Sequence, residues 1–368
     1  MTQVSNRLLS LDVMRGLTIA GMIMVNNPGS WKYVYAPLRH AEWNGLTPTD
    51  LVFPFFMFIM GVSMFFSLRK YDFKLTKASF WKVKKRAVLI FLVGFAINFL
   101  VTLLYDGWEG MKDLRILGVL QRLALAYGFG SFIGLTINHK YLLHTAVAFL
   151  LGYAVLLGLT GSTELSEGNL IAVIDRALFG PTHMYHDYLP DGTRIAFDPE
   201  GLLSCLGSIG HVLIGFYAGK LIADNKQDKG LIVQKLFILG TIILFAGLLL
   251  SYSCPINKKI WSSTFVLTTC GFASLLLALL MWIIDIKGQQ GWTLFFESFG
   301  VNPLYLYVQA DVLAVLMEFS GISAFIYMDL LRPLFGNFGG SLAFALFFVL
   351  LNWFPGYLLY KKRIYIKI

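Results

Sequence analysis

Several side chains that could do chemistry follow one another closely between the first two apolar segments of the chain. They are His40, Asn44, Thr47 and Asp50. Thr47 is followed directly by Pro48 and, three residues on, by Asp50, an order typical of the capped start of a helix. The positive end of that helix disfavours a nearby cation, so we expect His40 to stay neutral near pH 7, as a general base must.

The same segment also has a purely structural interpretation. Tryptophan and tyrosine gather where a membrane meets water. The segment is rich in them, with Trp31, Tyr33, Tyr35 and Trp43. Residue spacing alone leaves both interpretations open, a general base beside a helix start and an aromatic interfacial loop.

The composition indicates which elements must position these residues. Of 368 residues, 57% are hydrophobic and 14% are charged, whereas a soluble domain is about 25% charged. These values exclude a disordered chain and an ordinary water-soluble protein. Ten segments are long and apolar enough to cross a bilayer: 8–27, 50–68, 85–104, 115–136, 141–160, 202–222, 232–252, 262–284, 295–316 and 341–360. We therefore predict an all-α polytopic membrane protein of about ten transmembrane helices, with a further short or re-entrant helix in 319–340.

The basic residues predict the orientation of these helices. If the N-terminus is cytoplasmic, 20 of the 30 Lys and Arg residues fall on the cytoplasmic side, nine fall outside, and Arg122 lies within a span. An excess of this kind marks cytoplasmic loops, so we expect both termini in the cytoplasm. The net charge of +9 then follows from topology and does not indicate nucleic-acid binding.

We treat residues 1–368 as a single transmembrane domain with one long extracytoplasmic loop at about 161–201. That loop holds seven acids and an apolar stretch at 170–179, so we expect a lid or helical hairpin. The N-terminus lacks a cleavage site and Asp12 interrupts its apolar run, which predicts a retained first helix. The three cysteines form no C-x-x-C pair and indicate neither a disulfide framework nor a thiolate zinc site.

A second polar group lies within the predicted spans. Arg122 sits about 10 Å deep if the helix rises about 1.5 Å per residue, and a buried arginine needs a partner. We expect that partner among Asp50, Glu297 and Asp311, as a structural ion pair or beside substrate. Asn302 and the following Pro303 interrupt the ninth span, which predicts a broken helix that lines a polar cavity.

Several blocks of this sequence resemble the heparan-α-glucosaminide N-acetyltransferase family. The first and most specific combines Leu11-Asp12-Val13-Met14-Arg15-Gly16, His40-Ala41-Glu42-Trp43-Asn44-Gly45-Leu46-Thr47 and Asp50-Leu51-Val52-Phe53-Pro54. Others are Gly118-Val119-Leu120-Gln121-Arg122, Ile174-Asp175-Arg176, Asp198-Pro199-Glu200-Gly201-Leu202, Pro255-Ile256-Asn257-Lys258-Lys259-Ile260-Trp261 and Gly300-Val301-Asn302-Pro303-Leu304. The resemblance covers nearly the whole chain. It is to the transmembrane core, because no segment here matches the family's lumenal domain.

The resemblance implies a transmembrane enzyme that moves acetyl from cytosolic acetyl-CoA to a glucosamine amine on the far side of the membrane. It assigns the catalytic role to His40, with Asn26 as an assistant. The chemistry suits these residues, because an amine that attacks a thioester loses a proton and the carbonyl becomes an oxyanion. The side-chain amide of Asn26 or Asn44 could donate to that oxyanion, although Asn26 could instead bond the end of its own helix.

Acetyl-CoA carries phosphates that basic side chains hold well. Candidates on the predicted cytoplasmic side are Arg7, Arg15, Lys82, Lys84, Lys85 and Arg86. Each also has a simpler interpretation. Arg15 could pair with Asp12 three residues earlier, and the cluster from Lys82 to Arg86 could only anchor the cytoplasmic face.

No metal site is predicted, because His183 and His186 lack a third ligand in a suitable position. The partners we expect are an amino-sugar or glycan acceptor and the bilayer, with a second copy of the chain as a further candidate. The expected location is the inner membrane of a bacterium. Two other functions compete, an O-acetyltransferase of an envelope polysaccharide and a secondary transporter built on Arg122, Glu297 and Asp311. The transporter leaves the block from His40 to Gly45 unexplained.

Overall fold

A computed structural model describes residues 8–366 of the chain. These residues form helices α1 (Leu9–Asn26), α2 (Val52–Leu68), α3 (Lys77–Tyr105), α4 (Val119–Thr136), α5 (Leu142–Leu159), α6 (Leu170–Phe179), α7 (Cys205–Asp224), α8 (Lys229–Leu250), α9 (Ser263–Leu280), α10 (Thr293–Val301), α11 (Pro303–Phe319), α12 (Ile322–Phe325) and α13 (Arg332–Lys361). Strands β1 (His186–Tyr188) and β2 (Arg194–Ala196) form the sheet within the described range. The prediction of an all-α fold is confirmed for the described residues except for these two short strands.

Eight helical segments of the described chain are long and apolar enough to cross a membrane, and a ninth results if the bent pair α10–α11 is one span. These segments coincide with nine of the ten predicted spans. The tenth, at 115–136, forms α4, which is not among them. Gln121 and Arg122 lower the hydropathy of α4, so its length alone does not qualify it.

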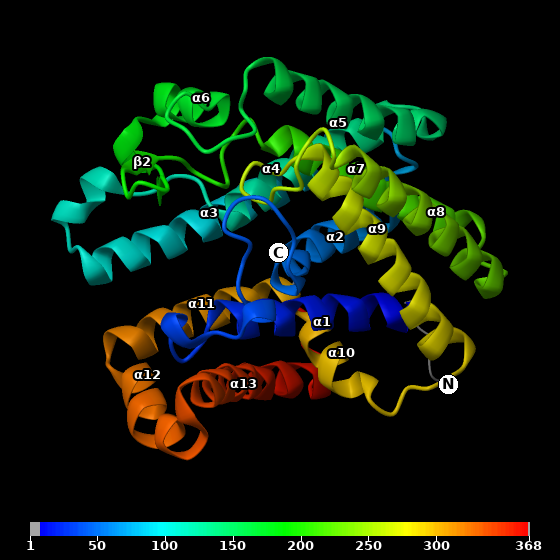
Figure 1. The fold of residues 1–368 in the computed structure, drawn as a ribbon. Coiled ribbons are helices and arrows are strands. Elements are labelled where there is room, and N and C mark those ends of the chain that lie inside the picture. Colours follow the sequence, from blue (N-terminus) through cyan, green and yellow to red (C-terminus); the bar gives the residue numbers. More distant parts are fainter. Residues whose placement is uncertain (1–7, 367–368) are drawn as a thin grey trace.

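The helices form two groups (Figure 1). α1 lies beside α10, α11 and α13, and the other long helices lie on the opposite side of α1. Small residues let the backbones touch. A Cβ on Gly16 of α1 would lie 1.7 Å from the carbonyl oxygen of Phe296, and one on Gly300 of α10 would lie 2.0 Å from that of Asp12. A larger residue at either position would separate α1 from α10.

The long loop contains α6 and a β-hairpin, so the expectation of a helical hairpin is wrong for its second half. His186, Asp187 and Tyr188 pair with Ala196, Ile195 and Arg194 in antiparallel register. The turn passes through Asp191 and Gly192, and Gly192 has φ +86°, which glycine adopts readily. We call the end of the bundle that carries α6, β1 and β2 the hairpin side (Figure 1).

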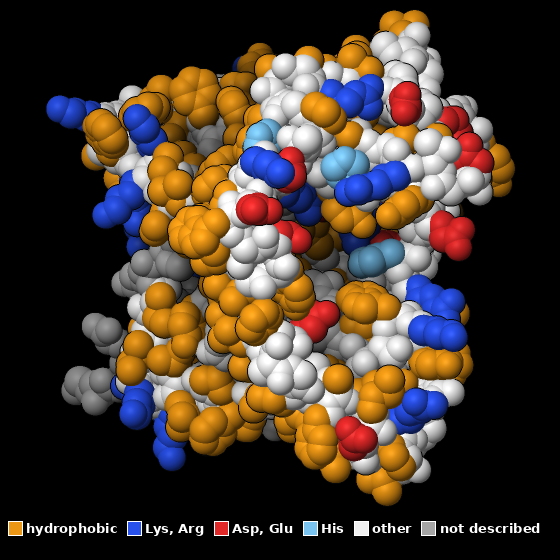
Figure 2. All heavy atoms as spheres, turned by 90° about the vertical axis from the view of Figure 1, so that its left-hand side faces the viewer, with side chains coloured by type: hydrophobic (Ala, Val, Ile, Leu, Met, Phe, Trp, Pro, Cys, Tyr) orange, Lys and Arg blue, Asp and Glu red, His pale blue; other side chains and the backbone are white. Residues whose placement is uncertain are grey.

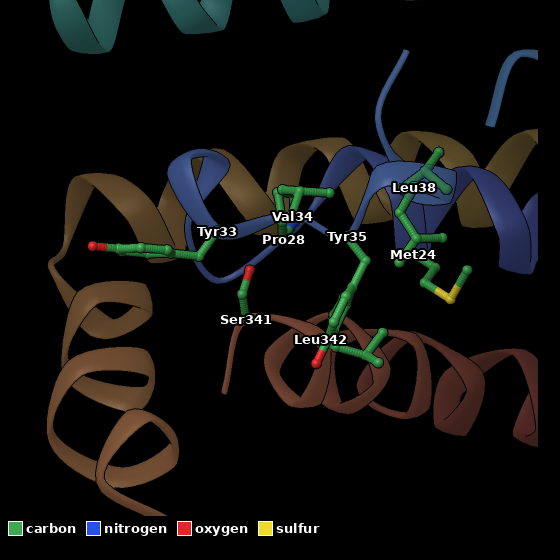
Figure 3. Close-up of a pocket in the computed structure, with 10 residues that line it drawn as sticks. Met24, Pro28, Tyr33, Val34, Tyr35, Leu38, Ser341 and Leu342 are labelled. Carbon is green, nitrogen blue, oxygen red and sulfur yellow. The ribbon is translucent and has the colours of Figure 1, made fainter. Parts of the chain in front are cut away.

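The segment between α1 and α2 is anchored on α13, which fixes the approach to His40. The Gly29 amide donates to the Ser341 carbonyl at 3.1 Å, and the Ser30 amide donates to the Ser341 hydroxyl at 3.1 Å. Figure 3 shows Tyr35 and neighbouring side chains of this segment packed against α13. The space left between them is about 10 Å³, so the contact is nearly filled.

The predicted short helix within 319–340 is present. It consists of α12 and a π-helical turn at Ile326–Leu331, followed directly by α13. Gly336, with φ +71°, interrupts the helical backbone near the start of α13. A residue with a Cβ would be strained there, so glycine sets the change of direction.

Candidate active site

His40 and Asp50 form a close pair on the hairpin side of the bundle. Nδ1 of His40 lies 2.6 Å from Oδ1 of Asp50. The His40 side chain is 43% exposed, whereas that of Asp50 is 1% exposed. A carboxylate on one ring nitrogen orients the imidazole and leaves the other nitrogen facing the accessible side, as a general base requires.

The start of α2 holds the carboxylate of Asp50 in place. Its second oxygen, Oδ2, accepts hydrogen bonds from the amides of Ala41 (3.0 Å) and Thr47 (3.1 Å) and from the Thr47 hydroxyl (2.9 Å). A 3-10 turn over Pro48–Leu51 leads into α2. The predicted cap at Thr47, Pro48 and Asp50 is therefore present, and Asp50, which accepts from the cap residue Thr47, is also the partner of His40.

Lys258, from the loop between α8 and α9, completes this group. Its Nζ lies 3.1 Å from His40 Nδ1 and 3.4 Å from Asp50 Oδ1. Burial lowers the pKa of Lys258, against the opposing effect of Asp50 and Glu200. Reasoning from residue types did not select Lys258, because it is 218 residues from His40. The only signal was its place in the block that begins at Pro255.

The two asparagines that could serve an oxyanion differ in their surroundings. Asn44 Oδ1 accepts from the buried Asn257 side chain at 3.2 Å, which leaves the Asn44 amide nitrogen free to donate elsewhere. Asn26 is exposed at the end of α1, and its side chain makes no hydrogen bond with the described residues. Asn27 makes the helix-end bond instead, donating to the Ile23 carbonyl at 2.8 Å.

Arg122 is buried, but its partners are not the expected acids. Its guanidinium donates to the Pro199 carbonyl and the Ser204 hydroxyl and lies 4.7 Å from the centre of the Trp261 ring. The expectation of a pair with Asp50, Glu297 or Asp311 is wrong among the described contacts. The segment before α7 brings carbonyl and hydroxyl acceptors directly to α4, and these satisfy the guanidinium without a carboxylate.

Glu297, Asn302 and Asp311, the polar residues of the interrupted helix, do not meet at one point. α10 and α11 are bent by 87° at Asn302, as predicted, and the Asn302 side chain bonds Ile364 and Ile366 of the C-terminal segment at 2.8 Å each. Asp311 lies beside the Tyr307 hydroxyl in α11. Glu297 instead lines a cavity of about 510 Å³ at the other end of the bundle from the hairpin side.

The basic residues proposed for phosphates are also dispersed. Arg15 contacts Asp12 (2.8 Å), the Gly300 carbonyl (3.1 Å) and the Ser63 hydroxyl (3.0 Å), so it ties α1 to α2 and α10. Lys82, Lys84 and Lys85 are exposed on α3, and Arg86 lies 4.8 Å from the Tyr127 ring. Arg7 lies outside the described residues. The cavity that Glu297 lines offers two further cations, Lys361 and Arg363.

The long loop is tied to the bundle by a buried ionic contact. Arg115 donates to both carboxylate oxygens of Asp198, at 2.9 and 2.7 Å, and to Glu200 at 2.7 Å. Burial raises the pKa of Asp198, but the Arg115 guanidinium outweighs it and holds that pKa below its ordinary value.

The same loop also packs on the segment that carries His40. The Trp43 indole donates to the Thr163 carbonyl at 3.0 Å, and its ring lies 5.5 Å from that of Phe197. Figure 2 shows this face, where most of the acidic and histidine side chains in view lie in the upper half. The loop therefore borders the candidate site.

Comparison with known proteins places the chain in a family. Residues 7–190 match the family model described as heparan-alpha-glucosaminide N-acetyltransferase, catalytic. The mouse (Mus musculus) heparan-alpha-glucosaminide N-acetyltransferase is 31% identical over 371 residues, covering 84% of this chain and 54% of the relative. The human (Homo sapiens) protein of the same name is 30% identical over 365 residues, covering 83% and 53%. The chain thus spans about half the length of these relatives. It belongs to the heparan-α-glucosaminide N-acetyltransferase family.

Proposed function

We propose that this chain is a transmembrane N-acetyltransferase. It moves acetyl from cytosolic acetyl-CoA to the amine of a glucosamine-type sugar or glycan on the opposite side of a bacterial inner membrane. Family membership and the apolar helices support the proposal. The observation that carries it is the His40–Asp50 pair, which lies within the residues that match the family's catalytic model.

His40 is the general base of the proposed reaction. The acceptor amine attacks the thioester carbonyl carbon, a C–N bond forms, the C–S bond breaks and the thiolate of CoA leaves. Nε2 of His40 takes the proton that the amine loses and returns it to the leaving sulfur. Asp50 holds the imidazole through Nδ1 and stabilises the imidazolium that forms in passing. The transfer is direct, because a thioester is activated enough for attack by a free amine.

Asn44 and Asn26 donate to the oxyanion of the tetrahedral intermediate in this proposal. Support for Asn44 comes from Asn257, which occupies its carbonyl oxygen and so directs its amide nitrogen outward. Support for Asn26 is that its side chain is exposed and not engaged with the described residues, since Asn27 makes the helix-end bond. Removing one such donor commonly lowers turnover by about 10²–10³.

The donor enters from the side opposite the hairpin. Its phosphates are highly charged, cannot cross the apolar core and must meet basic side chains at that end. Lys82, Lys85 and Arg86 lie in the first ten residues of α3, and Arg7 and Arg15 lie near the start of the chain. Lys361 and Arg363 line the cavity at that end and extend the basic set. The pantetheine arm then reaches through the bundle to His40, while the loop at about 161–201 covers the acceptor.

The test uses the purified chain in detergent with labelled acetyl-CoA and a panel of amino sugars and glycans. The proposal expects an N-acetylated product, with turnover lowered by about 10²–10⁴ in His40→Ala and unchanged in the exposed His144→Ala control. Acetyl found only on hydroxyl groups would assign an O-acetyltransferase. Without a gradient a transporter gives no product, so no transfer to any acceptor would return the choice to that class.

A further inference from the structure

The 2.6 Å contact between His40 and Asp50 fixes the position of one proton. An ionised carboxylate oxygen only accepts, so the 2.6 Å contact assigns the hydrogen to Nδ1, and the Lys258 ammonium, which only donates, then bonds Asp50 Oδ1 and not Nδ1. In the neutral ring the second nitrogen, Nε2, then carries the lone pair. This tautomer is the one that can accept a proton from an amine.

The same contact creates a difficulty for catalysis. A carboxylate against Nδ1 stabilises the imidazolium, the form of His40 that cannot accept a proton. Asp50 alone would therefore favour the inactive form. A positive charge close to the ring has the opposite effect, and Lys258 supplies one at 3.1 Å from Nδ1 and 3.4 Å from Asp50 Oδ1.

Hydrogen bonds within the loop around Lys258 and to the segment of His40 hold Lys258 next to the imidazole ring. The Gly45 amide donates to the Ile256 carbonyl at 2.8 Å, which joins this loop to the segment of His40. The buried Asn257 accepts from the Ile260 amide at 3.0 Å, and the Trp261 amide donates to the Lys258 carbonyl at 3.0 Å. Lys258 therefore lies on a rigid support shared with the catalytic segment.

We propose that Lys258 is a positioning residue that keeps His40 in its neutral form by offsetting the charge of Asp50. This inference rests on the proposed function, because it concerns the base of that reaction. The charged groups that face the ring are Asp50 from the start of α2 and Lys258 from the α8–α9 loop. Glu200 and Arg122 act on Lys258 from further away, with opposite signs.

The experiment measures turnover against pH for the full chain in detergent, with Lys258→Met and Lys258→Arg. Removing the cation is expected to move the acid limb of the profile up by about one pH unit, since nearby charges shift titrations by about 1–3 units. Lys258→Arg should keep the acid limb near that of the native chain. Lys112→Met is the control, because Lys112 is an exposed lysine in the segment before α4 and makes no described hydrogen bond or ion pair with His40 or Asp50.

A second readout does not depend on activity. NMR titration of chain labelled at its six histidines, with the His40 signal assigned from a His40→Gln sample, should show the same upward shift in Lys258→Met. A turnover that falls equally at every pH, with an unmoved His40 titration, would overturn the inference. If the native chain transfers acetyl to no acceptor, the proposed function fails, and the NMR titration still decides the role of Lys258.

Discussion

Asp50 serves two purposes with its two oxygens. Oδ1 faces His40, whereas Oδ2 accepts from the Thr47 amide and hydroxyl at the start of α2 and from the Ala41 amide beside His40. The start of α2 and the proposed base His40 therefore share Asp50 as a partner, and the orientation of the imidazole depends on where α2 begins.

Because the two oxygens of Asp50 have different partners, the effect of Asp50→Asn can be predicted. An asparagine has one acceptor oxygen, so it can serve His40 or the cap but not both. We expect turnover to fall by about 10²–10⁴, as when the carboxylate of a catalytic triad is made an amide, with a lowered melting temperature. Turnover and thermal unfolding are measured beside Asp106→Asn, an exposed acid at the end of α3. Native turnover in Asp50→Asn would contradict the role given to this pair.

At this scale the sequence predicted the cap and the neighbourhood of His40, because both arise from residues within ten positions. It could not predict Lys258 or the partners of Arg122. Those contacts depend on how distant loops meet, and many acceptors can satisfy a buried guanidinium.

Among the secondary-structure elements, the sequence predicted the bend between α10 and α11 but not the β-hairpin. Asn302-Pro303 predicted the bend between α10 and α11, because proline cannot continue the backbone hydrogen bonds of the preceding helix. The β-hairpin was missed, although Asp191-Gly192 is a recognised hairpin signal. Its strands have three residues each, which is too short for an alternating pattern to stand out.

The contact between Arg115 and Asp198 predicts how the long loop responds to acid. The Asp198 pKa is lowered in the folded chain, so its stabilisation is complete above the ordinary value of about 3.9 and is lost as pH falls further. We expect proteolysis within 161–201 to quicken as the pH falls below about 4. In Asp198→Asn it should already be faster at pH 7 and change less with acid.

Asp191→Asn, at the exposed hairpin tip, is the control for that experiment and should leave cleavage at neutral pH unchanged. Equal cleavage of the native chain and Asp198→Asn at every pH would show that this contact does not hold the loop.

The whole molecule is two groups of helices with the candidate site on one side and, on the other, a cavity lined by two acidic and two basic side chains. Its membrane class was readable from composition, since apolar spans of this length leave no other solution. The span count was less secure, because α4 carries Arg122 inside the bundle and composition cannot distinguish a polar residue that faces protein from one that faces lipid.

The most direct measurement of the central claim places donor and acceptor on opposite sides of one membrane. The full chain is sealed into vesicles whose orientation is read from maleimide labelling of a cysteine introduced at Lys77 or Asp191. We predict N-acetylglucosamine only when acetyl-CoA is on the Lys77 side and glucosamine on the Asp191 side, at a rate about 10²–10⁴ lower in His40→Ala. Product formed with the donor on the Asp191 side, or at the native rate in His40→Ala, would contradict the account.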